Sequence, residues 1–127
     1  ADSDHHERLA DVLRLLMSAL SEKIRKAREI RVSIGGHTFV ILRPTTMDMI
    51  ELQGQSAARA ILKHIIGWES VTTLDLYPGG DGAPAPFDAD ACAEWLSDRV
   101  DLLGPIAQAA VDAYDAHRQA IEDNAKN

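Results

Sequence analysis

The sequence predicts a mostly helical α+β domain, with about four to five helices and one β-hairpin. Aromatic residues make up only 5% of the 127 residues, while Ala and Leu are abundant, which favours helices over a β-sandwich. Several segments repeat apolar residues at spacings of three and four, the period of a helix. Residues 30–42 change to a period of two around a Gly-Gly pair, which indicates a hairpin. The length favours one domain, in which an N-terminal amphipathic helix (residues 1–29) precedes a body (residues 30–127).

The first expected helix spans residues 4–28, and either Ser3 or Asp4 can cap its start. Its apolar residues form one stripe: Leu9, Val12, Leu13, Leu16, Leu20 and Ile24. Packing of this stripe on the same chain is the default expectation, and self-association with a second copy is the alternative. Four leucines of the stripe are therefore candidate partner-binding residues: Leu9, Leu13, Leu16 and Leu20.

The hairpin is expected from two strands, residues 30–34 and 38–42, joined by Gly35 and Gly36. Glycine adopts positive φ without a steric penalty, so this pair suits a tight turn. Pro44 ends the return strand, because proline has no N–H to donate to a β-ladder. An isolated hairpin is marginal in water, so this one must pack on helices or pair with another chain.

Residues 45–66 predict a second helix, which Thr45 or Thr46 can cap and which Gly54 weakens. Gly67 follows at the position where a residue in the left-handed conformation usually ends a helix.

Two further helices are expected near the C-terminus. Asp88 can cap the first of them, residues 89–99. Asp101 can cap the second, residues 102–123, although Pro105 is welcome at a first helical position and would then move the start.

The charge balance argues against nucleic-acid binding. Thirteen basic residues face twenty acidic ones, for a net charge of -7, whereas phosphate binding needs a basic surface. One basic cluster is local and is explained either as a solvated helix end or as a small patch. It consists of Lys23, Arg25, Lys26, Arg28 and Arg31.

No residue pattern predicts an enzyme, a cofactor or a metal site. The five histidines lack the spacing of a zinc site. The single cysteine, Cys92, lies between alanines near a helix start, where a small buried hydrophobe is favoured over a reactive thiol. A single cysteine excludes an intrachain disulfide and fits a reducing cytosol. No apolar run is long enough to cross a membrane, and no signal peptide is evident.

A long Gly- and Pro-rich loop begins near Trp68 and ends at Phe87. These two aromatic rings can fold back and fix the loop to the core. Alternatively, Trp68, Tyr77 and Phe87 form a shallow pocket that holds a partner helix, since Trp and Tyr are favoured interface anchors. The three aromatic residues are the second set of candidate partner-binding residues.

The order of several short motifs is more informative than any one motif. A hairpin closes with FVILRPTT, a helix runs into IIGWESV, and a turn-rich loop ends in PAPF before two helices. This order resembles the tail assembly chaperones of long-tailed (siphovirus-like) bacteriophages and prophages, in which a Trp-Glu-Gly-Val-like sequence and a later Pro-Phe occur. The matching residues are Gly67, Trp68, Glu69, Val71, Pro86 and Phe87. Ser70 replaces the usual Gly, and the insertion TTLDLYPGGDGA is longer than the short turn expected there.

The resemblance covers residues 30–127 and implies a non-enzymatic protein of the bacterial host cytoplasm. Such chaperones bind the long tape-measure protein, keep it soluble, help to recruit tail-tube subunits around it, and leave before the particle is complete. A structural tail or head-tail connector component of the virion is the alternative function. A small regulatory or toxin-neutralising protein is a third. Neither nucleic acid nor a membrane is an expected partner.

Overall fold

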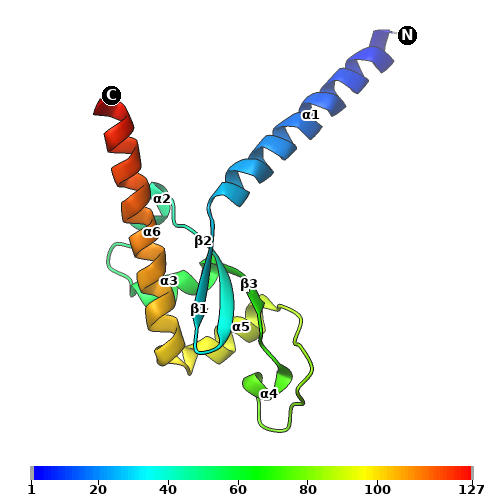
Figure 1. Cartoon of the computed structure of the whole chain (residues 1–127). Coiled ribbons are helices and arrows are strands. Elements are labelled where there is room, and N and C mark those ends of the chain that lie inside the picture. Colours follow the sequence, from blue (N-terminus) through cyan, green and yellow to red (C-terminus); the bar gives the residue numbers. More distant parts are fainter. Residues whose placement is uncertain (1, 127) are drawn as a thin grey trace.

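The computed structural model describes the backbone of residues 2–126 and the side chains of residues 4–126. Within this range it has six α-helices, one short 3-10 helix and one three-stranded antiparallel sheet (Figure 1). The predicted fold class, α+β and mostly α, is confirmed. The described residues have one strand beyond the predicted hairpin, and six α-helices where about four to five were expected.

Helix α1 (Asp2–Ala27) confirms the expected N-terminal helix. It begins at Asp2, so the prediction that Ser3 or Asp4 caps it is wrong. Figure 1 shows α1 as a straight rod that leaves the rest of the chain at β1 and ends far from the other helices. The body therefore folds without α1 lying across it.

The hairpin is confirmed and forms two thirds of the sheet. Strands β1 (Glu29–Ile34) and β2 (His37–Leu42) pair antiparallel around Gly35 and Gly36, which have φ of 59° and 82°. Positive φ at both central residues is what a tight hairpin turn requires. Strand β2 lies in the middle, because β3 pairs along its other side in the order β1-β2-β3.

The single helix expected over residues 45–66 is wrong. The segment forms, in order, α2 (Thr46–Glu51), α3 (Ala57–Ile61), the 3-10 helix η1 (Leu62–His64) and β3 (Ile65–Glu69). Gly54 has a φ of 86° and stands in the turn that separates α2 from α3. Gly67 lies inside β3 opposite Val40 and does not end a helix. The expected cap at Thr45 is confirmed, because its side chain and that of Asp48 form a reciprocal capping box.

The remaining helices are α4 (Thr73–Leu76), α5 (Ala89–Ser97) and α6 (Val100–Lys126). Asp88 caps α5 as expected, accepting the Ala91 N–H at 3.0 Å. Both predicted starts of α6 are wrong, since the helix begins at Val100 and contains Pro105. A turn that closes on the Arg99 carbonyl starts it earlier, and Pro105 then removes only one intrahelical hydrogen bond.

The core lies between the sheet and the helices α3, α5 and α6, as Figure 1 shows for the long helix α6 beside the strands. Its largest fully buried side chains include Phe39, Ile41, Leu96, Leu102 and Ile106. These residues come from β2, α5 and α6, so the hairpin is stabilised by helices of its own chain. No buried side-chain nitrogen or oxygen among the described residues lacks a hydrogen-bond partner, as expected of a closed core.

Candidate partner-binding surfaces

Trp68 connects the sheet to the end of the long loop. Its side chain is 8% exposed, and its indole Nε1 donates a hydrogen bond to the Ala85 carbonyl at 2.8 Å. The Phe87 ring meets the indole edge-on, with centroids 5.1 Å apart, and Trp95 packs on the indole at 6.1 Å. Trp68 and Phe87 thus hold the loop to the core, the first of the two roles considered for them.

The loop itself is folded by its own hydrogen bonds. Thr72 and Asp75 form a capping box around α4, and the Thr73 hydroxyl donates to a carboxylate oxygen of Asp81 at 2.7 Å. The hydrogen bonds from the backbone and side chain of Thr72 hold the pKa of Asp75 below its ordinary value. The Ala85 N–H donates to the Val71 carbonyl at 2.8 Å. Residues 71–85 therefore form an ordered surface projection, called the ledge below, whose carboxylates are ionised.

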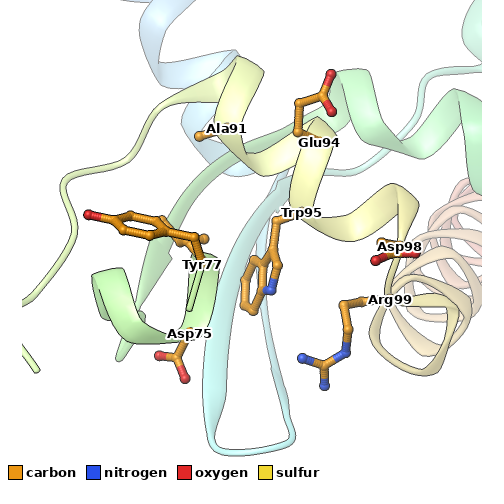
Figure 2. A pocket seen from close by; sticks show the side chains of 8 residues that line it. Asp75, Tyr77, Ala91, Glu94, Trp95, Asp98 and Arg99 are labelled. Carbon is orange, nitrogen blue, oxygen red and sulfur yellow. The ribbon is translucent and has the colours of Figure 1, made fainter. Parts of the chain in front are cut away.

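An open cavity of about 510 Å³ lies between this ledge and α5. Figure 2 shows Trp95 in the middle, with Tyr77 and Arg99 on opposite sides of it. The lining side chains are Asp75, Leu76, Tyr77, Ala91, Glu94, Trp95, Asp98 and Arg99. Tyr77 is 54% exposed, so it is the aromatic candidate that remains free to touch a partner. Neither Trp68 nor Phe87 lines this cavity.

The cavity is acidic. Three carboxylates and one guanidinium line it. The guanidinium, that of Arg99, donates hydrogen bonds to both carboxylate oxygens of Asp101, at 3.0 and 2.9 Å. The Asp101 carboxylate raises the pKa of Arg99, and Arg99 lowers that of Asp101. The arrangement can attract a cationic side chain.

The leucine stripe of α1 is the larger apolar surface. All of its members are about half exposed or more, from 49% at Leu9 to 62% at Leu16. Two further large side chains of α1, Leu15 at 70% and Met17 at 68%, are also exposed. The default expectation, that the stripe packs on the same chain, is wrong. A contiguous apolar surface of this kind usually marks an interaction site.

Cys92 and His37 belong to residue types that enzymes often use, and both pack against the core in this structure. Cys92 is buried, and burial raises the pKa of its thiol to about 11, which leaves it protonated at neutral pH. The His37 ring bonds the Ser70 carbonyl at 2.8 Å and stacks edge-on against Trp95. Among the described side chains, those of residues 4–126, no group of three or more His, Cys, Asp or Glu could hold a metal ion.

Sequence reasoning missed the acidic cavity. Glu94 lies on α5, and Asp98 follows one turn later as the residue that caps its end, so helical spacing alone could have grouped these two exposed carboxylates. Asp75 and Tyr77 could not be added in this way, because the fold of the loop brings α4 to α5.

Comparisons of the chain with protein-family models, curated proteins and solved structures found no match. Within the described residues, no helix is both long enough and apolar enough to span a lipid bilayer.

Proposed function

We propose that this chain is a non-enzymatic tail assembly chaperone of a long-tailed bacteriophage or prophage, and that it binds the tape-measure protein through α1. The observation that carries the proposal is the exposed leucine stripe on a helix that projects from a body with its own closed core. A tape-measure protein offers long apolar helical stripes. Two such helices can cover each other by packing their apolar faces.

The two motifs behind the resemblance form one structural unit, which supports the proposal. Trp68 of the first motif contacts Phe87 of the second, although the two residues are 19 positions apart in the sequence. Ser70 has a φ of 60°, in the left-handed region that favours glycine. The family's usual glycine at this position would serve the same turn.

The charge of the body suits a protein that lines up along a partner in many copies. Residues 30–127 contain fourteen acidic and seven basic residues. The bodies of neighbouring copies therefore repel one another. Release before the particle is complete requires weak individual contacts, and many weak contacts along one long chain still give strong overall binding.

The test is co-expression with the long helix-rich protein encoded beside this chain. We expect the wild-type chain to raise the soluble fraction of that protein and to co-purify with it. The variant Leu13→Lys/Leu16→Lys, which places two charges on the stripe, should do neither. Ser18→Lys/Ser21→Lys adds the same charges to the polar face of α1 and should behave as the wild type. Equal behaviour of the two variants would contradict binding through the stripe.

Analysis of purified particles distinguishes the chaperone from the connector function. A chaperone leaves during assembly, so mass spectrometry of mature particles should find none of this chain. Its presence in stoichiometric amounts would favour a structural tail or head-tail connector component.

A further inference from the structure

Helix α1 carries a seam with the spacing of a two-stranded coiled coil. Positions separated alternately by three and four residues run along the stripe: His6, Leu9, Leu13, Leu16, Leu20, Lys23 and Ala27. This alternation is the heptad pattern with which two helices pack knobs into holes. The seam is apolar in its middle and polar towards both ends, so its centre lies between Leu13 and Leu16.

The charges of α1 are segregated along its length. Residues 2–13 contain four acidic and one basic residue, whereas residues 14–27 contain one acidic and four basic residues. The helix is thus neutral as a whole but has an acidic half and a basic half. An identical helix laid antiparallel on it brings each acidic half against a basic half, while a parallel copy brings like charges together.

We propose that α1 pairs antiparallel with α1 of a second copy of this chain, with Leu13 of one chain opposite Leu16 of the other. The same register places Leu9 opposite Leu20 and His6 opposite Lys23. Both copies use the same surface, as a two-fold symmetric dimer requires. The pairing covers the surface through which the proposed function works, but it does not depend on that function.

The shape of the chain permits this pairing. Helix α1 has 26 residues, about 39 Å at 1.5 Å per residue, and the body is attached only at its C-terminal end (Figure 1). An antiparallel pair therefore holds the two bodies at opposite ends of the rod. Residues 75–101 of the body carry seven acidic residues and only one basic residue, so this separation also keeps two acidic surfaces apart.

The apolar area is sufficient for a dimer. The six large apolar side chains of the stripe are 49–62% exposed, and full burial of one such side chain removes roughly 60–120 Å² from water. The stripe can therefore supply several hundred Å² from each copy, the order of the roughly 800 Å² per partner found in stable interfaces. Most of the stability of a protein helix comes from packing of its apolar face, so pairing also stabilises α1 itself.

The first test is the mass of the purified full chain by analytical ultracentrifugation, over roughly 1 µM to 1 mM, which spans moderate to weak affinities. We expect a shift with concentration to twice the chain mass of 13.9 kDa, together with a rise in helical circular dichroism. Leu13→Lys/Leu16→Lys should stay monomeric, whereas Ser18→Lys/Ser21→Lys should dimerise as the wild type does. A wild-type monomer at every concentration would overturn the proposal and leave the stripe free for another partner.

Disulfide trapping tests the antiparallel arrangement. His6→Cys and Lys23→Cys are made separately, and Cys92 does not interfere, because it is buried with a raised thiol pKa. Under mild oxidation an equal mixture of the two variants should form a covalent heterodimer, while each variant alone should not. Cross-linking of each variant with itself would show parallel pairing and overturn the proposal.

The two proposals fail separately. Dimerisation is measured on the chain alone, so loss of tape-measure binding with an intact dimer would contradict only the proposed function. A monomer that still solubilises the tape-measure protein would contradict only the self-pairing.

Discussion

Helix α1 and the body contain similar apolar patterns but differ in what covers them. The leucine stripe of α1 lies in solvent, whereas Phe39, Trp68 and Leu96 of the body are covered by other parts of the same chain. The net charge differs as well, since residues 2–27 are balanced and the body is acidic. The difference teaches that the body buries its apolar residues within the same chain, whereas the stripe of α1 is left uncovered by it.

Removing the Trp68 side chain should cause the largest loss of stability. Trp68→Ala deletes a buried indole and its hydrogen bond to Ala85, so the free energy of unfolding should fall by about 3–5 kcal/mol. Leu15→Ala on α1 removes a side chain that is 70% exposed and should cost under about 0.5 kcal/mol. Urea unfolding followed by far-UV circular dichroism measures both. Similar losses of unfolding free energy in the two variants would contradict the distinction between a body with a buried core and a helix with an uncovered apolar face.

Substitutions in the hairpin turn should cause the next largest loss of stability. A Cβ added at Gly35 would lie 3.1 Å from Leu102 Cδ2, whereas one at Gly36 would meet nothing within 4 Å. Both residues have positive φ, which costs an alanine about 1–2 kcal/mol. Gly35→Ala should therefore destabilise the body more than Gly36→Ala in thermal unfolding. Equal effects would mean that the turn does not pack closely on α6.

Ser70 offers a change in the opposite direction. Ser70→Gly relieves the left-handed backbone, at some cost in the flexibility of the unfolded chain, so a net gain of about 0.5–1 kcal/mol is expected. The hydrogen bond from His37 uses the Ser70 carbonyl and survives the change. Urea unfolding checks the gain, and a loss of stability would contradict the assigned turn.

Acid should loosen the loop of the body. The pKa of Asp75 is lowered by hydrogen bonds from Thr72, so its contribution to stability is present above the ordinary aspartate pKa of about 4 and is lost as the pH falls through the lower folded value. Asp75→Asn should therefore make stability less dependent on pH below the ordinary aspartate pKa of about 4. A pH titration of unfolding midpoints measures it, and an unchanged slope would contradict the effect.

The sequence predicts local structure where one pattern excludes the others. The Gly35–Gly36 pair between alternating strands allows only a hairpin, and the repeat in residues 4–28 allows only a helix. Strand β3 is missed because the short apolar run before Gly67 fits a helix end as well as a strand. The segment becomes a strand because it pairs with the side of β2 that β1 leaves unpaired, and this pairing partner is known only from the fold.

The candidate surfaces show the same limit. The leucine stripe is evident from the sequence. Whether the body covers it depends on the angle between α1 and β1, which the chain sets at Arg28. Trp68 suggests an interface by its residue type, and the structure uses it internally instead. The acidic cavity joins α4 to α5 through a folded loop, so only Glu94 and Asp98 could have been paired in advance.

Hydrogen–deuterium exchange of the wild-type chain at low and high concentration tests the central claim most directly. At low concentration we expect α1 to exchange quickly while β1–β3, α5 and α6 remain protected, because exchange reports local opening. At high concentration residues 9–24 should gain protection and the body should not change. If α1 is protected as strongly as the body at every concentration, it packs on its own chain and the account is wrong.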